Sequence, residues 1–118
     1  MKPIRQSDRI LIEQAYAGFN ARRIPEVLAL MHADVDWPKG MEGGTVHGHD
    51  AVRAYWTRQW TMIDPRVEPR EISMEPNGDV AVRVRQWVRD LQGGPISDGE
   101  VRHVYRIEHG LIRTMRIE

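Results

Sequence analysis

In the first half of the chain, apolar residues recur at the three- and four-residue spacing of amphipathic helices. The first such stripe consists of Ile12, Ala15, Tyr16 and Phe19. Ser7 is a suitable N-terminal cap for this helix, and Asn20 is a suitable C-terminal stop. The same spacing from Ile24 to Met31 predicts a second helix that begins near Pro25. The two helices should form a hairpin with a shared apolar face.

A short strand, a glycine-rich turn and a third helix come next. Residues 34–37 alternate polar and apolar side chains and end at Pro38, which is typical of a short strand. Residues 45–47 can pair back on this strand as a small hairpin. The third helix should begin near His49 or Asp50. Its inward stripe consists of Val52, Tyr55, Trp56, Gln59 and Trp60.

From residue 66 onward the helical spacing gives way to alternation, which predicts strands over 66–75, 80–90, 96–108 and 111–118. Asn77-Gly78, Gly93-Gly94 and His109-Gly110 separate them, and each pair is a good hairpin signal. Helices first and hairpin-linked strands last indicate an α+β domain with an antiparallel sheet. The chain is short enough that residues 1–118 should form one domain.

Alternation also predicts which side chains of the long strands face the helices. In the strand over 80–90, the inward set would consist of Val80, Val82, Val84, Gln86 and Val88. In the strand over 96–108, it would consist of Val101, His103, Tyr105 and Ile107. Two polar residues, Gln86 and His103, then lie inside. Buried polar groups cost free energy unless something bonds them, so these two residues are candidates for a site.

Composition excludes several classes of protein. There are 17 Lys plus Arg and 17 Asp plus Glu, so the formal net charge is zero, whereas a nucleic-acid binder usually has a basic excess. No apolar run approaches the ~20 residues of a membrane span, and the first residues lack the apolar segment of a secretory signal. Cysteine is absent, which excludes disulfides and thiol chemistry. We therefore expect a cytoplasmic protein that binds neither membranes nor nucleic acids.

Several local motifs together resemble the NTF2-like superfamily, and within it the SnoaL-like group of small bacterial proteins. They are Asn20-Ala21 after the first helix, VDWP at 35–38, the segment 48–56, and RHVY at 102–105 followed by GLI at 110–112. The resemblance covers nearly the whole chain. It implies a cone-shaped fold, in which three N-terminal helices pack on a curved antiparallel sheet and the open mouth admits a ligand. It also implies a homodimer formed through the outer face of the sheet.

Among enzymes of this superfamily, ketosteroid isomerases use a carboxylate base and an oxyanion hole. By resemblance, Trp37 stands at the position of their base, and His103 stands where they have a protonated carboxylic acid. Trp56 matches a tyrosine of their pocket, and their oxyanion tyrosine falls near Ala15 or Tyr16. Ketosteroid isomerisation by the usual arrangement is therefore not expected.

The residues predicted to line a ligand pocket are Tyr16, Trp37, Trp56, Trp60, Gln86 and His103. The tryptophans would give a flat apolar surface suited to a small apolar or cyclic ligand. His103 is the candidate catalytic residue, either as a general acid or base or as a hydrogen-bond donor to a carbonyl. The alternative is a structural histidine bonded to Tyr16 or Gln86.

Two carboxylates and two histidines near the short strand give weaker signals. Alternation turns Asp34 and Asp36 outward, although a twist before Pro38 would bring Asp36 into the pocket. His47 and His49 flank one glycine, which is not a specific pattern of metal ligands. No metal and no cofactor is predicted.

On the outer face of the sheet, arginines alternate with glutamates on neighbouring strands, and Trp87 and Val104 lie among them. An apolar spot among paired charges suits a homodimer interface. For function, two classes stay open. The first is an isomerase, cyclase or dehydratase that transfers a proton on a carbonyl-containing cyclic substrate. The second is a non-catalytic ligand-binding or dimerisation module, so the sequence does not decide whether the protein is an enzyme.

Overall fold

Helices occupy part of the first half of the chain and strands most of the second half in the computed structural model, which describes residues 4–40 and 42–118. The helices are α1 (Gln6–Asn20), α2 (Ile24–Leu28) and α3 (His49–Gln59). The strands are β1 (Met31–Pro38), β2 (Thr45–His47), β3 (Asp64–Met74), β4 (Val80–Arg89), β5 (Pro95–Glu108) and β6 (Leu111–Ile117). The predicted α+β class is confirmed, and the four long strands lie within two residues of their predicted bounds at every end.

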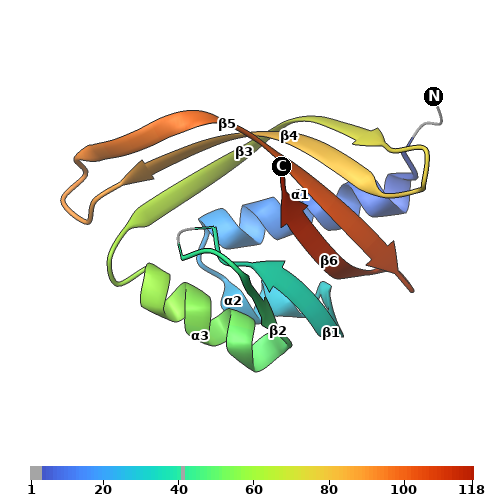
Figure 1. Cartoon of the computed structure of the whole chain (residues 1–118), viewed down its shortest axis with the longest axis horizontal. Coiled ribbons are helices and arrows are strands. Elements are labelled where there is room, and N and C mark those ends of the chain that lie inside the picture. The colour runs from blue at the N-terminus through green and yellow to red at the C-terminus, as the bar shows by residue number, and fades with distance from the viewer. Residues whose placement is uncertain (1–3, 41) are drawn as a thin grey trace.

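All six strands form one open sheet in the order β2-β1-β6-β5-β4-β3. Every neighbouring pair is antiparallel except β1 and β6, which run parallel. The prediction of a purely antiparallel sheet is therefore wrong. A parallel pair needs a long connection, and here most of the chain lies between the two strands. Figure 1 shows the long strands curving over α1, with α3 lying beside β2 below them.

Two helix ends differ from the predictions. The cap position of α1 is held by Arg5 without a side-chain bond, so Ser7 lies inside the first turn and is not the cap. The second helix ends at Leu28, and Met31 begins β1 rather than extending the helical stripe. The reason is the sheet, because Ile112 of β6 donates its backbone N–H to Leu30 O at 2.9 Å. Pairing with β6 thus overrides the helical spacing.

Helix α1 is held closely against its neighbours at its C-terminal end. Asn20, its last residue as predicted, accepts a hydrogen bond from Val67 N at 3.0 Å and donates one to Val67 O at 2.7 Å. Gly18 packs on α2 so closely that an added Cβ would lie 2.5 Å from Val27 Cγ2. These contacts fix α1 against both β3 and α2, and so fix one wall of the space beneath the sheet.

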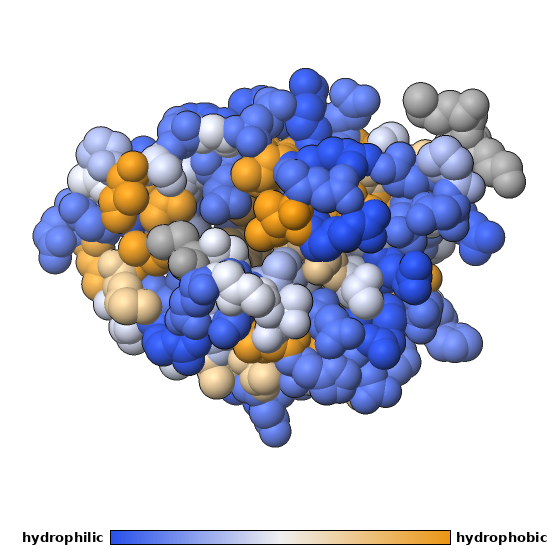
Figure 2. Space-filling model, in the orientation of Figure 1, coloured by the Kyte–Doolittle hydropathy of each residue, from blue (hydrophilic) through white to orange (hydrophobic). Residues whose placement is uncertain are grey.

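The main core lies between the helices and the concave face of the sheet. Fully buried aliphatic residues there include Ile12, Val35, Val82, Val84 and Ile112. On the outside, Figure 2 shows a mostly hydrophilic face with separate apolar areas. Among residues 4–40 and 42–118, the large apolar side chains that are exposed are Ile10, Met62, Leu91, Ile96 and Ile117. Among the described residues, no helix is long and apolar enough to cross a membrane.

Candidate functional site

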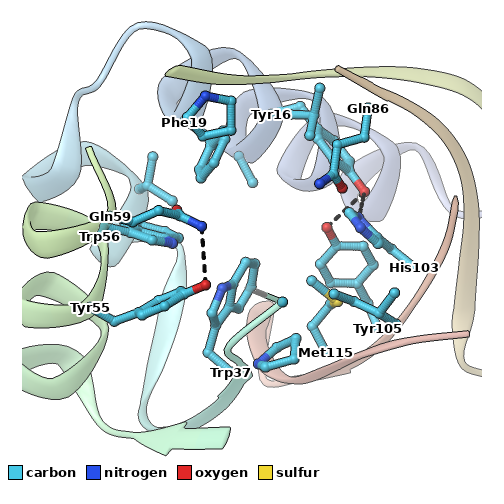
Figure 3. A pocket seen from close by; sticks show the side chains of 17 residues that line it. Tyr16, Phe19, Trp37, Tyr55, Trp56, Gln59, Gln86, His103, Tyr105 and Met115 are labelled. Atoms are coloured by element: carbon cyan, nitrogen blue, oxygen red, sulfur yellow. Dashed lines mark hydrogen bonds between the residues drawn. The ribbon is translucent and has the colours of Figure 1, made fainter. Parts of the chain in front are cut away.

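An aromatic cavity lies beneath the curved sheet, between the helices and strands β1, β3, β4, β5 and β6 (Figure 3). The space open to the centres of water-sized molecules is about 80 Å³. Besides Met115, the aromatic and polar side chains of the lining are Tyr16, Phe19, Trp37, Tyr55, Trp56, Gln59, Gln86, His103 and Tyr105. They come from α1, α3, β1, β4, β5 and β6. The cavity therefore gathers residues that are far apart in the sequence.

Five of the six residues predicted to contact a ligand line this cavity: Tyr16, Trp37, Trp56, Gln86 and His103. Trp60 does not. Its indole stacks on Trp56 with ring centroids 5.7 Å apart, and the Arg22 guanidinium lies 4.7 Å from its ring centroid. Trp60 is the C-terminal cap residue of α3, and its ring packs against Trp56 and Phe19.

A chain of hydrogen bonds runs through the buried polar side of the cavity. Tyr105 Oη and Tyr16 Oη lie 2.8 Å apart, and Tyr16 Oη and His103 Nδ1 also lie 2.8 Å apart. The rings of Tyr16 and His103 are nearly parallel, at an interplanar angle of 7°. His103 is therefore bonded to Tyr16, as the structural alternative required, and it also lines the cavity.

One arrangement of protons lets both tyrosine hydroxyls of this hydrogen-bonded series donate to a partner. If Tyr105 donates to Tyr16, and Tyr16 donates to Nδ1 of His103, the imidazole carries its proton on Nε2. Either direction leaves one donor without a partner among the described residues, at a cost of about 1–3 kcal/mol if it is buried. The first direction leaves the Nε2–H of His103, which is 5% exposed, and the opposite one leaves the hydroxyl of Tyr105, which is 1% exposed. The first arrangement is therefore favoured.

The Nε2–H of His103 then faces the cavity. Within residues 4–40 and 42–118, no hydrogen bond to this atom occurs, and the one buried side-chain polar atom sealed off without a partner is Nε1 of Trp60. Nε2 is therefore not sealed off by the described residues, and His103 is part of the cavity lining. A molecule in the cavity would meet a hydrogen-bond donor at this point.

Burial keeps all three groups of this chain neutral. It lowers the pKa of His103 from 6.5 to about 4, because the charged imidazolium would lose its hydration. Burial likewise raises the pKa of the Tyr16 hydroxyl, with further increases from the neighbouring Tyr105. The pKa of Tyr105 is also raised by burial. At neutral pH the cavity thus presents an uncharged imidazole with a donor, and not an imidazolium.

A second polar pair, Tyr55 and Gln59, lies on the opposite wall of the cavity (Figure 3). Gln59 Nε2 donates to Tyr55 Oη at 3.1 Å, and both residues are almost fully buried. The sequence placed both on the inward stripe of the third helix but did not mark them as site residues. Tyr105 was missed in the same way, whereas Met115 was not assigned to either face of the last strand. The signal for Tyr105 was its alternation with His103.

No described residue that lines the cavity carries a carboxylate, an ammonium or a guanidinium group. Asp36 points away, as alternation indicated, and its Oδ1 lies 2.8 Å from His47 Nδ1. That hydrogen bond is the main reason why the pKa of Asp36 is lowered, with smaller contributions from the charges of His47 and Arg113. His49 bonds instead to Met31 O at 3.0 Å, so His47 and His49 have different partners.

The outer face of the sheet differs from the prediction in one respect. Val104 is completely buried, so it cannot form an exposed apolar spot. Arg116 stands opposite Val104 and reaches Asp79, while Arg102 reaches Glu75. Arginine side chains therefore cover the valine. Trp87 is half-buried with the Arg85 guanidinium 4.6 Å from its ring centroid, and dimerisation through Trp87 stays a prediction.

Comparisons with known proteins agree with this geometry. The model of the SnoaL-like domain family matches residues 12–115. An NTF2-like protein of unknown function from Burkholderia pseudomallei shares 30% sequence identity over 97% of this chain and 91% of that chain, with a TM-score of 0.83. TerC, crystallised with polyporic acid, shares 28% identity over 96% of this chain and 91% of that chain, also with a TM-score of 0.83.

A third similar structure is a Mycobacterium tuberculosis protein in complex with estradiol-17β-hemisuccinate. It shares 21% identity over 96% of this chain and 93% of that chain, with a TM-score of 0.80, which shows a common fold. No curated protein matches the chain in sequence.

Proposed function

The chain belongs to the SnoaL-like domain family, and from that premise we propose that it binds a neutral, flat cyclic molecule through a carbonyl oxygen. One observation carries the proposal: His103, with Nδ1 bonded to Tyr16, lines an aromatic cavity whose described lining has no formal charge. The lowered pKa of His103 and the favoured proton arrangement make Nε2–H the donor. A carbonyl is a matching acceptor. An ionised ligand would lose its hydration without gaining a counter-charge, which is costly.

The shape and size of the cavity support the same class of ligand. Trp37 and Trp56 stand edge to face with ring centroids 5.5 Å apart, so their rings border the space from two directions. The space open to the centres of water-sized molecules is about 80 Å³ here. One bound water needs roughly 10–15 Å³ of such space. The cavity as it stands therefore suits a ligand of one or two fused rings, and a larger molecule requires side chains to move.

Two relatives of the same fold are crystallised with organic molecules, polyporic acid for TerC and estradiol-17β-hemisuccinate for the mycobacterial protein. This supports a small-molecule role for the cavity. It does not identify the ligand of this chain, whose pocket residues decide what fits.

Proton transfer on the bound ketone, as in an isomerase, cyclase or dehydratase, is the second candidate function. The observation that favours it is the position of the His103 Nε2–H, which would stabilise negative charge on a carbonyl oxygen as an oxyanion hole does. With its pKa lowered to about 4, His103 is a weak base at neutral pH, so it suits this donor role better than proton abstraction. No described carboxylate lines the cavity, so the residues present supply the donor of such a reaction and not its base.

The binding proposal is tested by isothermal titration with two bicyclic molecules, 1-tetralone and its hydrocarbon tetralin, which lacks the oxygen. The wild-type protein should bind the ketone about five- to tenfold more tightly, because the ketone alone accepts a hydrogen bond. In His103→Leu this preference should disappear. Met115→Leu, which changes a lining residue without hydrogen bonds, is the matched control and should keep the preference. A preference that survives in His103→Leu refutes the proposed donor.

A further inference from the structure

We propose that the buried pair Tyr55–Gln59 on α3 is a second ligand-binding subsite, and that the ligand carries a hydroxyl group at the end opposite its carbonyl. This inference rests on the proposed function, because it takes the carbonyl to lie at His103. It adds a second group of the ligand, a hydroxyl, that the protein recognises. The ligand class thereby narrows from a cyclic ketone to a flat cyclic hydroxyketone.

Tyr55 and Gln59 lie on one wall of the cavity. Tyr55 and Gln59 lie one turn apart on α3, and both line the cavity. In the close view they occupy the wall opposite Tyr16 and His103, with Trp37 between the two polar groups (Figure 3). The cavity therefore has two polar ends separated by an aromatic middle.

The side-chain amide of Gln59 has a hydrogen-bond acceptor that no described residue uses. Its side-chain nitrogen donates to Tyr55 Oη at 3.1 Å, so its carbonyl oxygen points away from that hydroxyl. Its carbonyl oxygen, Oε1, accepts no hydrogen bond from any residue in 4–40 or 42–118, although the residue is only 9% exposed. This oxygen is not among the sealed polar atoms of the described chain, and Gln59 is a residue of the cavity lining. We take Oε1 to open into the cavity.

The two polar ends of the cavity differ in hydrogen-bonding character. At His103 the protein offers a donor, so a ligand must bring an acceptor there. At Gln59 the protein offers an acceptor, so a ligand must bring a donor. A buried carbonyl without a partner is costly, and a hydroxyl of the ligand would satisfy it. A ketone and a hydroxyl at opposite ends of one flat ring system meet both requirements.

Gln59 is thus a residue that determines specificity, and Tyr55 is the residue that positions its amide. The alternative is that the two residues only satisfy each other within the protein. In that case a hydroxyl on the ligand would add no affinity, since nothing would receive its proton. The two readings therefore differ in a measurable way.

The experiment uses isothermal titration of the whole chain with three bicyclic ketones. They are 1-tetralone, 6-hydroxy-1-tetralone and 6-methoxy-1-tetralone, which differ only at the end away from the carbonyl. We expect the hydroxyl compound to bind the wild-type protein about five- to tenfold more tightly than 1-tetralone. The methoxy compound cannot donate a hydrogen bond, so it should bind no better than 1-tetralone.

Two variants then assign the effect to a residue. Gln59→Met keeps the length of the side chain but removes the amide, and it should abolish the advantage of the hydroxyl compound. Met115→Leu, another residue of the lining, should keep that advantage. Tyr55→Phe removes the hydrogen bond that orients the amide and should reduce the advantage, which provides a second readout if Gln59→Met does not fold.

The outcomes separate the two proposals. If 1-tetralone binds but the hydroxyl adds nothing, the second subsite is overturned and the carbonyl site at His103 stands. The same holds if the hydroxyl compound keeps its advantage in Gln59→Met. If none of the three ketones binds at millimolar concentration, both proposals are overturned. An advantage that is lost in Gln59→Met and kept in Met115→Leu supports the subsite.

Discussion

The two faces of strand β5 are polar in different ways. On the inner face, His103 and Tyr105 join Tyr16 through hydrogen bonds between neutral groups, enclosed by the aromatic cavity. On the outer face, Arg102 and Arg106 alternate with them. Their partners are carboxylates just outside the strand ends: Glu75 after β3, Asp79 before β4 and Glu118 after β6. A lost inner bond leaves a buried donor or acceptor without a partner, whereas most outer ion pairs are open to water and contribute about 0–1 kcal/mol.

This difference shows that the number of polar contacts on a face does not measure their contribution to the free energy of unfolding. The outer face holds many ion pairs, yet almost all of their side chains are more than a quarter exposed. Asp79 is the exception, with a side chain 6% exposed and with Arg106 and Arg116 at 3.7 and 3.4 Å. Four experiments test this comparison, from the largest expected effect to the smallest.

Replacing Trp56 with Ala should cause the largest loss, because this side chain is only 1% exposed and packs on Trp37, Phe19 and Trp60. We expect the free energy of unfolding, measured in urea, to fall by about 3–5 kcal/mol. The matched control is Trp87→Ala on the outer face, which should cost less than half as much because Trp87 is only half-buried. Equal losses would contradict the distinction between the two faces.

Acid should weaken the inner face through His103. Its pKa is about 4 in the folded protein and 6.5 when exposed, so between these values the unfolded chain binds a proton that the folded chain does not. The contribution of His103 to the free energy of unfolding is therefore fully present above pH 6.5. It is lost as the pH falls towards 4, by about 3 kcal/mol in total. Urea unfolding at several pH values measures it.

His103→Asn is the control for this pH dependence, because other groups also titrate in acid. In that variant the slope of unfolding free energy between pH 4 and 6.5 should be smaller than in the wild-type protein. A direct check is the titration of the His103 ring by nitrogen NMR, which should also show the proton on Nε2. Protonation near pH 6.5 would mean that the imidazole is hydrated and the cavity open.

Tyr105→Phe should have a smaller effect. It removes the hydroxyl that donates to Tyr16 and leaves one buried acceptor short of a partner, at a cost of about 1–2 kcal/mol in urea. The ring and its packing are kept, so the loss reports the hydrogen bond. A loss near zero would mean that water replaces the Tyr105 hydroxyl.

Arg83→Gln should have the smallest effect. Arg83 lies on the outer face, 3.5 Å from Glu71 and 3.8 Å from Glu100, with more than half of each side chain exposed. We expect a change below about 1 kcal/mol, and a smaller one in 1 M salt. A larger loss than that of Tyr105→Phe would reverse the ranking of the two faces.

Local patterns in the sequence predict most of this fold. Alternation and the Asn-Gly and Gly-Gly pairs locate the four long strands, because strand faces and tight turns are decided by neighbouring residues. The parallel pairing of β1 with β6 was not predicted, since the partners lie far apart and nothing local marks the pairing. The second helix was predicted too long for the same reason, because pairing with β6 ends it.

For the site, alternation placed His103 and Gln86 in the cavity, and it turned Asp36 outward. It did not reveal that Val104 is covered, because alternation says which face a side chain is on and not what lies over it. The roles of Tyr55 and Gln59 were also missed. Both looked like ordinary members of an apolar stripe, and only the arrangement in space shows that they oppose His103.

The pairing of β1 with β6 also has a consequence for synthesis. Ribosomes deliver the chain from the N-terminal end, so β1 leaves with its neighbour β2 but without its partner on the other side. Until residues 111–117 emerge, the strand that carries Trp37 has an unpaired edge, and the wall formed by Met115 does not exist. We expect nascent chains arrested before residue 111 to be protease-sensitive, which pulse proteolysis on stalled ribosomes would measure.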